Sequence, residues 1–434
     1  MFRTRLIVLM LFSLIANDYA LAALVEWDSA NNGRWDDASN WSTNSIPNAG
    51  DVVVIDFSGR VDIRMPGEQA GTLTNQATVR ARKGGTLDLS DLDNRKTVNI
   101  NDNGSYVRVT NETNNSGTIA INKAGEFTTD LLTNAKKAKL TANNGSSIRT
   151  QGIVDNQGKV TLNKNSSLTA NEWSNAKSGQ ITASRNSGVT VSGYFDNRGK
   201  FTLSRDSVAT VQTLDNSNRL TVTRDSNLTV QQTLTNSSRT VLSRGAQVNA
   251  QSFVQTSGFT SIDQAVLSAN TVAIDGGELR GNGVVAGEIV IGSKGRINPG
   301  VNSKNAGHLT VDGSLQLLGT TIIDVFNASD FDKINVSGPL TLGGTLRIRF
   351  QGGYAPEAGN QFDFLTAAIV GGAFGKIVLP KLPSLNLDIV QTANGVSLLA
   401  AAPVPLPPAA WLFLSSAALL VVVGRRGRIQ RQLA

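Results

Sequence analysis

An internal repeat with a period of about 20 residues occupies the chain from about residue 115 to residue 256. In each copy an asparagine precedes a short strand of alternating apolar and polar residues, then a polar turn and a second alternating strand. A coil of this length cannot bury its inner face until neighbouring coils stack on it. The period therefore predicts an all-β chain folded as a right-handed parallel β-helix, or β-solenoid, of about fourteen coils and ~65 Å at ~4.8 Å per coil. The repeated asparagines, spaced by 19 to 22 residues, are Asn115, Asn134, Asn156, Asn175, Asn197, Asn216 and Asn236.

The composition agrees with a chain of many short strands. Its 434 residues include 42 Gly but only 6% aromatic residues, which favours strands and turns over helical packing. The chain has no Cys and a single His, His308, so disulfides, thiolate metal sites, a Cys nucleophile and sites that need two histidines are excluded. We expect no cofactor, and the repeats carry Asn and Ser where a calcium-binding array would carry Asp.

The repeated asparagines have a structural interpretation. Asparagine tolerates the left-handed turn conformation, and identical amides stacked one coil apart can form a hydrogen-bonded ladder. We therefore expect the series from Asn134 to Asn236 to stabilise the solenoid rather than to bind a ligand.

A second series, of basic residues, follows the first strand of each coil. Its spacing of 19 to 21 residues should stack like charges along one edge of the solenoid, where they repel one another. An anionic polysaccharide lying along the solenoid would relieve this repulsion. The alternative is a row of solvated side chains at turns, partly neutralised by Asp206 and Asp225. We call the series the basic ladder; it consists of Lys164, Arg185, Arg205, Arg224 and Arg244.

Three tryptophans lie close together near the N-terminus, at Trp27, Trp35 and Trp41, ahead of the hydrophobic run Val52–Ile55. Flat rings in this density could form a platform that stacks on sugars. The alternative is an aromatic plug that covers the unpaired strand edges at the open end of a solenoid. The segment resembles the N-terminal segment of many bacterial surface proteins and autotransporter-like β-helix proteins, and we favour the plug.

Glycine-rich and more apolar coils begin at Gly276. Repeats such as Gly287–Ile291 and Gly295–Gly300 resemble the passenger-domain repeat of autotransporter proteins, in which glycines close tight corners. The resemblance implies that the solenoid continues to a C-terminal cap.

Catalytic residues are sparse in this pattern. The best acidic cluster is Asp324, Asp330 and Asp332, which we interpret as structural, and His308 has no visible partner. Parallel β-helices do include polysaccharide lyases and hydrolases, and solenoid coils bring distant carboxylates together, so paired acids stay an alternative. We expect no enzymatic activity.

Both ends of the chain carry targeting features. Arg3 and Arg5 precede the apolar run Leu6–Ile15, and Ala20–Ala22 supplies small residues for signal peptidase. At the other end an apolar run at 409–424, followed by basic residues, is typical of a short membrane-spanning helix with a cytoplasmic tail. The two segments predict export of everything between them.

The C-terminal segment resembles the VPLPA-type form of the PEP-CTERM sorting signal, although Leu406 stands where the commonest form has Glu. The resemblance implies processing by an exosortase near Pro405 and display at the surface, or in the exopolysaccharide matrix, of a Gram-negative bacterium after an inner-membrane intermediate. The residues that match the motif are Val404, Pro405, Leu406, Pro407, Trp411, Arg425 and Arg426.

The net charge of +7 comes mostly from these targeting segments. Without them the exported body holds 34 basic and 32 acidic residues, so we expect no nucleic-acid partner.

These observations predict five segments and one function. We expect an exported, non-catalytic adhesin or scaffold of an exopolysaccharide or biofilm matrix, with a polysaccharide lyase or hydrolase and a self-assembling surface-layer protein as alternatives. The segments are the signal peptide (1–22), a Trp-rich cap (23–63), an Asn-repeat solenoid (64–275), a Gly-rich solenoid with its cap (276–400) and the sorting signal (401–434).

Overall fold

The computed structural model describes residues 22–301 and 305–402. They form two compact units, with the boundary between Val254 and Gln255. Together the units contain about 13 turns of parallel β-solenoid, which confirms the predicted fold class for these residues and is one turn fewer than expected. The right-handed winding stays a prediction.

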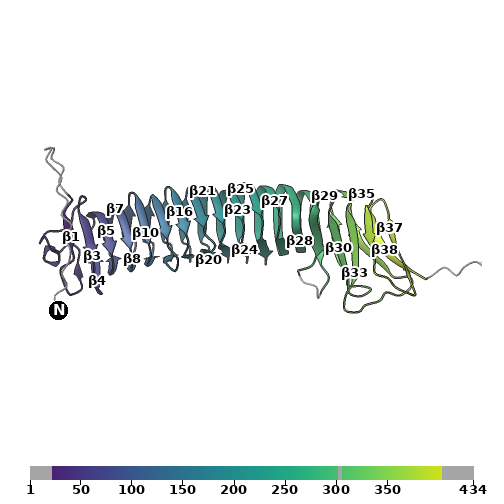
Figure 1. Cartoon of the computed structure of the whole chain (residues 1–434), viewed down its shortest axis with the longest axis horizontal. Helices are drawn as coiled ribbons and strands as arrows, with labels where there is room; N and C mark the ends of the chain where they lie inside the picture. Colours follow the sequence, from purple (N-terminus) through teal and green to yellow (C-terminus); the bar gives the residue numbers. More distant parts are fainter. Residues whose placement is uncertain (1–21, 302–304, 403–434) are drawn as a thin grey trace, which may run out of the picture. The chain divides into compact units, whose positions relative to one another are not determined.

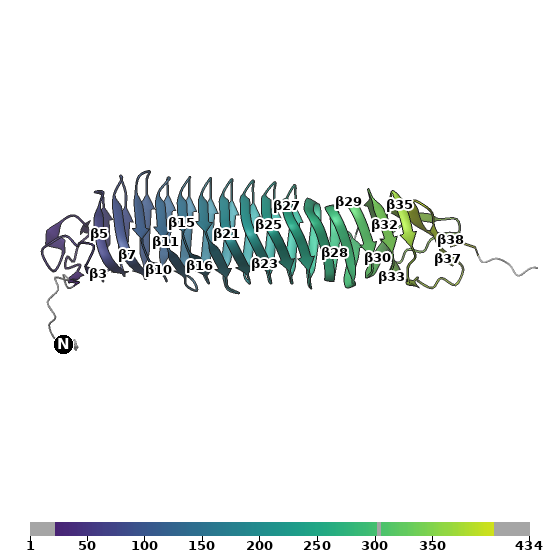
Figure 2. The ribbon, with the colours of Figure 1, turned by 90° about the horizontal axis from the view of Figure 1, so that it is seen from above.

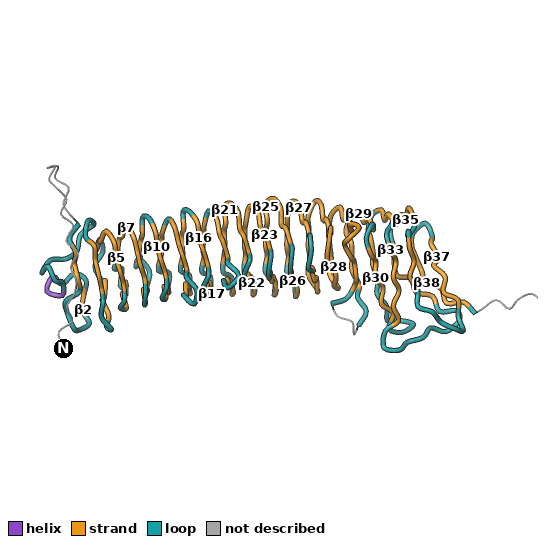
Figure 3. Tube along the Cα trace, in the orientation of Figure 1, coloured by secondary structure: helices purple, strands orange, loops and turns teal. Residues whose placement is uncertain are grey.

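The coils of the first unit build three sheets, which we call face A, face B and face C. Figure 1 shows these coils stacked from purple to teal, and Figure 3 shows short turns between their strands. Every strand pairs in parallel with the equivalent strand of the next coil, as Thr141 does with Thr161 and Thr161 with Thr182 on face A.

The three faces have the following strands. Face A contains β2 (Gly33–Arg34), β4 (Arg60–Ile63), β6 (Thr78–Ala81), β8 (Thr97–Asn101), β11 (Thr118–Asn122), β14 (Lys139–Asn143), β17 (Lys159–Asn163), β20 (Gln180–Ser184), β22 (Lys200–Ser204), β24 (Arg219–Thr223) and β26 (Arg239–Ser243). Face B contains β9 (Tyr106–Val109), β12 (Glu126–Thr129), β15 (Ser147–Thr150) and β18 (Ser167–Ala170). Face C contains β1 (Leu24–Glu26), β3 (Val52–Ile55), β10 (Glu112–Asn115), β13 (Leu131–Asn134), β16 (Ile153–Asn156) and β19 (Glu172–Asn175). Strands that run from face B into face C without a break are β5 (Glu68–Asn75), β7 (Thr86–Asn94), β21 (Gly188–Asn197), β23 (Val208–Asn216), β25 (Asn227–Asn236) and β27 (Gln247–Gln255).

The core of the first unit follows from the alternation of its strands. In β17, Val160 and Leu162 are fully buried while the residues between and beside them face outward. Complete burial of a Val or Leu side chain contributes roughly 1.5–3 kcal/mol, and every coil repeats it on three faces. Stacking of coils is therefore what stabilises each strand.

The tryptophans of the N-terminal segment are buried. Trp27, Trp35 and Trp41 are 7%, 0% and 1% exposed, and Trp41 packs edge-on against both other rings beside the short helix η1 (Ala38–Asn40). Rings that are enclosed in this way cannot present a flat face to a sugar. The sugar-platform hypothesis is therefore wrong, and the rings pack as a plug.

The second unit closes its corners with glycine. A Cβ on Gly281 or Gly287, both at positive φ, would lie 1.8 Å from a backbone oxygen of the preceding coil, so no other residue fits. Strand β28 therefore continues through several corners (Figure 2), and the predicted boundary at residue 276 falls inside it. Its strands are β28 (Phe259–Pro299), β29 (His308–Leu317), β30 (Thr320–Val325), β31 (Lys333–Val336), β32 (Pro339–Leu342), β33 (Thr345–Phe350), β34 (Gln361–Thr366), β35 (Ile369–Gly372), β36 (Lys376–Val378), β37 (Asn386–Gln391) and β38 (Gly395–Ala401).

The last strands of this unit change direction. Strand β38 pairs antiparallel with both β34 and β37. An antiparallel hairpin laid against the final parallel strands covers their edges, which would otherwise be open to pairing with another chain.

No helix within the described part of the chain has the length and apolar character to cross a membrane. Except for Ala22 and residues 401 and 402, the predicted signal peptide and the predicted sorting signal, including the helix 409–424 and the motif from Val404 to Arg426, lie outside the described residues.

Candidate functional site

The repeated asparagines end the face C strands and form one continuous side-chain ladder. Each Nδ2 donates to the Oδ1 of the next asparagine at 2.7–2.9 Å, and all of them are buried. None has a positive φ, so the left-handed turn offered as one reason for their recurrence is wrong. The ladder begins two coils earlier than the sequence suggested and runs through Asn75, Asn94, Asn115, Asn134, Asn156, Asn175, Asn197, Asn216 and Asn236.

The same amides also fix face A. The second hydrogen of each Nδ2 points to the carbonyl oxygen at the start of a face A strand; Asn115 donates to Lys139 at 3.1 Å and Asn197 to Arg219 at 3.1 Å. A buried amide satisfied in this way holds the backbone of those strands in place. The outward-facing side chains of face A are therefore carried by strands whose backbone is fixed from inside.

The basic ladder lies at the turns between face A and face B. All five side chains are exposed, and the turns are bonded from coil to coil: the backbone N–H of Asp206 donates to Arg224, and that of Asp225 to Arg244. Neither Asp206 nor Asp225 forms an ion pair with any residue in the described ranges. Partial neutralisation of the basic ladder by these two exposed carboxylates therefore does not involve direct ion pairs.

These turn positions have an unusual backbone. Residues such as Arg205 and Arg224 have φ of 57° and 55°, a region that costs an L-residue roughly 1–2 kcal/mol and that favours Gly or Asn. Along nine successive turns, seven of these positions nevertheless hold Lys or Arg. Lys83 and Lys123 extend the ladder towards the N-terminus.

A second basic row, which the sequence analysis missed, lies along the opposite edge of face A. Its residues open the face A strands in parallel register, and all are exposed, with Gln180 the one uncharged member. We call it the strand row; it comprises Lys139, Lys159, Gln180, Lys200, Arg219 and Arg239.

The surface between the two rows is polar and uncharged. It holds a threonine column from Thr141 to Thr221 and, beside it, Asn and Ser residues such as Asn163 and Ser204. No acid faces outward from strands β11 to β26 of this face. Face C, in contrast, carries a column of acids that includes Asp155, Asp196 and Asp215. The first unit is therefore basic on face A and acidic on face C.

An arginine cluster occupies face A at its N-terminal end. The carboxylate of Asp62, only 3% exposed, contacts Arg60 (3.3 Å), Arg64 (2.9 Å), Arg80 (2.9 Å) and Arg82 (2.8 Å). Although burial opposes ionisation, hydrogen bonds from Arg80 and Arg64 lower the pKa of Asp62 to about 2. One negative charge thus faces four positive ones.

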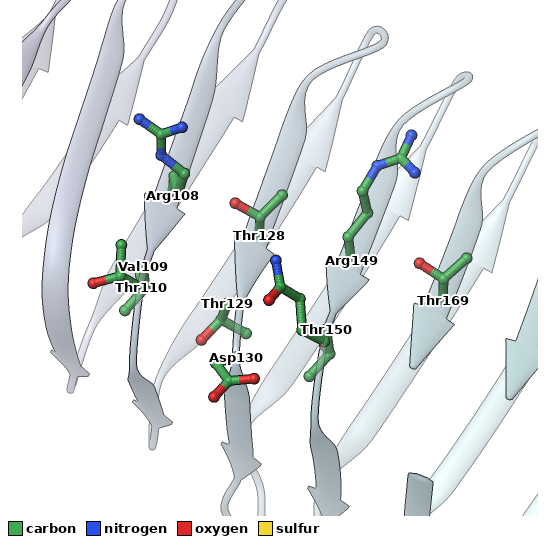
Figure 4. Close-up of a pocket in the computed structure, with 10 residues that line it drawn as sticks. Arg108, Val109, Thr110, Thr128, Thr129, Asp130, Arg149, Thr150 and Thr169 are labelled. Carbon is green, nitrogen blue, oxygen red and sulfur yellow. The ribbon is translucent and has the colours of Figure 1, made fainter. Parts of the chain in front are cut away.

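A groove of about 550 Å³ lies on face B. Arg108 and Arg149 stand two coils apart with the short Thr128 in register between them, which leaves the hollow seen in Figure 4. Both arginines are paired with carboxylates, Arg108 with Asp88 at 2.7 Å and Arg149 with Glu126 at 2.8 Å. The groove can take a short polar ligand, but both arginines are neutralised and Asp130 adds a further carboxylate to its lining, so face A is the stronger candidate for an anionic polymer.

The acidic cluster of the second unit has structural contacts. Asp324 accepts from Arg349 at 2.6 Å and from Gln351 at 2.8 Å, and the fully buried Asp332 accepts the backbone N–H groups of Asp324 and Gly307. Burial raises the pKa of Asp332 to about 7.

The other candidate residues add no second site. Asp330 sits in a turn where its backbone N–H donates to Asn327, and His308 is exposed at the start of β29, where it pairs in register with Lys333. No group of three or more acids and histidines suited to a metal is present in residues 22–301 and 305–402.

Comparison with known proteins gives a likeness in structure but none in sequence. No protein-family model and no curated protein sequence matches the chain. Among solved structures it is similar to the crystal structure of the Haemophilus influenzae Hap adhesin, at 13% identity and a TM-score of 0.26. The similarity covers 87% of this chain and 59% of that chain, so the chain spans about three fifths of the adhesin's length.

Proposed function

We propose that the chain is an exported, non-catalytic surface protein whose face A binds an acidic polysaccharide, and that it acts as an adhesin or scaffold in an exopolysaccharide matrix. The observation that carries the proposal is the basic ladder itself. Lys or Arg occupies turn positions where Gly or Asn would cost less, and strain of this kind is retained where a side chain has a use.

The arrangement of charge supports a polymer rather than a small ligand. Exposed cations contribute little one at a time, about 0.2–1 kcal/mol each, but the basic ladder and the strand row repeat at every coil. A polymer that contacts several coils gains binding free energy from each contact, but it loses its translational and rotational entropy only once. The uncharged Thr, Asn and Ser columns between the rows offer hydroxyl and amide groups to sugar hydroxyls.

Export and anchoring in this proposal rest on the sequence. Signal peptidase would remove residues 1–22, an exosortase would recognise the segment from Val404 to Arg426, and the helix 409–424 would hold an inner-membrane intermediate of a Gram-negative cell.

A self-assembling layer is the competing function, and the acids of face C favour it. Asp155, Asp196 and Asp215 could meet face A of a second copy, a contact between different surfaces that would build open arrays. Face A carries its cations on both edges. On face C, part of the negative charge is neutralised by ion pairs such as that of Asp196 with Arg198. A flexible external polyanion therefore fits face A better.

The proposal predicts weaker polymer binding when the basic ladder is neutralised. Changing Arg205, Arg224 and Arg244 together to Gln should lower the affinity of the full chain for polygalacturonate about tenfold at low salt, because three exposed contacts are lost. Binding should also weaken steeply as salt is added. The measurement is a binding isotherm across a salt series, with the polymer examined afterwards for new reducing or unsaturated ends.

A matched control removes the same charge from the second unit. Lys294, Lys376 and Lys381 are exposed there, and their change to Gln should leave the affinity unaltered. Equal losses of affinity in the two variants would mean that only net charge matters. Cleavage of the polymer would move the protein to the lyase or hydrolase class. Concentration-dependent self-association without polymer binding would favour the self-assembling layer.

A further inference from the structure

The four arginines around Asp62 hold more positive charge than their one carboxylate can neutralise. Two adjacent coils supply these arginines. Their side chains are partly exposed: Arg60 40%, Arg64 34%, Arg80 25% and Arg82 23%. Like charges held at this density repel, so a folded chain keeps them together only with anions nearby. Asp62 supplies one.

Both oxygens of the Asp62 carboxylate contact arginines. Its Oδ1 contacts the Nε of Arg80 and of Arg60, and its Oδ2 contacts Nη2 of Arg64 and of Arg82. In the described part of the chain, the Nη1 groups of Arg64, Arg80 and Arg82 make no hydrogen bond, and they are not among the buried unpaired atoms. They are therefore donors that a ligand in solution can reach.

We propose that this arginine cluster binds a tetrahedral oxyanion, a sulfate or phosphate ester carried by the polymer that lies along face A. An arginine fork suits both carboxylates and tetrahedral oxyanions, but a carboxylate has two oxygens whereas a sulfate ester offers three free ones. Three oxygens can each accept from a different guanidinium. The inference rests on the proposed function, since it names the substituent that the polymer carries.

The cluster and the basic ladder lie on one face. Register connects Arg80 through Asn99, Ala120 and Thr141 to Thr161, four coil steps or about 19 Å. One polymer can thus contact both. The cluster, in which Asp62 fixes the guanidiniums, is the preorganised contact. The five side chains of the basic ladder are exposed, and of these Arg185 donates to Asn163 at 3.2 Å.

The test compares three polymers and one inorganic ion on the full chain. In the double variant Arg80→Gln, Arg82→Gln, the affinity for dextran sulfate should fall about tenfold, the loss of one or two charge-assisted hydrogen bonds. The affinity for polygalacturonate should stay within about twofold. Polyphosphate in place of dextran sulfate distinguishes phosphate from sulfate esters.

The control variant is Arg95→Gln, Arg198→Gln. Each of these arginines is exposed and paired with an aspartate two residues before it, so their loss removes equal charge without touching the cluster. Equal losses for dextran sulfate in the two double variants, or an equal loss for polygalacturonate and dextran sulfate in the cluster variant, would overturn the proposal.

A second measurement does not depend on the polymer. Asp62→Asn leaves the four arginines without their carboxylate and should lower the unfolding temperature, and inorganic sulfate at constant ionic strength should raise it more in this variant than in the unaltered chain. No greater rise would overturn the proposal. Binding of inorganic sulfate without binding of any polymer would overturn the proposed function while supporting the cluster as an anion site.

Discussion

Replacing Asn115 by Ala is expected to lower the free energy of unfolding of the first unit by about 3 kcal/mol. Its side chain accepts from Asn94 at 2.7 Å and donates to Asn134 at 2.8 Å and to the Lys139 carbonyl at 3.1 Å. The side chain is buried, so water cannot replace the lost partners, and the variant leaves three polar groups poorly satisfied. Urea denaturation followed by circular dichroism measures the change.

The neighbouring residue provides the control. Asn114 lies on the same strand but is exposed on face C, so its change to Ala should alter the unfolding free energy by less than about 0.5 kcal/mol. If the two variants lost the same stability, the intrinsic preference of Asn for these strands would explain the repeat and the hydrogen-bonded ladder would not.

The asparagine series shows what a single sequence can and cannot predict. The period reveals the solenoid because an identical residue at every coil must occupy an identical place. It gives the ladder from Asn115 onwards, but Asn75 and Asn94 lie in early coils whose turns lack the later pattern, so they were missed. The backbone conformation was assigned to the wrong series: positive φ belongs to the basic ladder, where hydrogen bonds between stacked turns outweigh the residue preference.

The candidate site was half visible in the sequence. The strand row precedes the basic ladder by five residues at every coil, as Lys159 precedes Lys164 and Arg219 precedes Arg224. A five-residue strand spans one face, so this offset places a cation on each edge, and it could have been recognised. The arginine cluster could not, because four arginines meet on Asp62 only once the register of β4 and β6 is known.

The stability of the first unit should fall as pH rises from about 4.5 to 7, and Glu68 is the reason. This side chain is 9% exposed and makes no hydrogen bond with the described residues. Its burial, together with the charge of Asp36 and against that of Arg34, raises its pKa from 4.5 to about 7. Between these values the folded chain holds a proton that the unfolded chain has released, so the stabilisation is complete below pH 4.5 and lost above pH 7.

The expected loss is about 2 kcal/mol, less than the full shift implies because Glu68 lies near solvent. Glu68→Gln mimics the protonated side chain, so the variant should show a flat profile over this window and exceed the unaltered chain in unfolding temperature above pH 7. Glu172→Gln, at an exposed position, should keep the decline in stability between pH 4.5 and 7.

Asp62 acts in the opposite sense, because its pKa of about 2 makes its contribution to stability disappear only as pH falls below about 4. The two groups together place the maximum of the unfolding free energy near pH 4–5. If Glu68→Gln kept this maximum and the same decline in stability towards pH 7, a group other than Glu68 would be responsible for the decline.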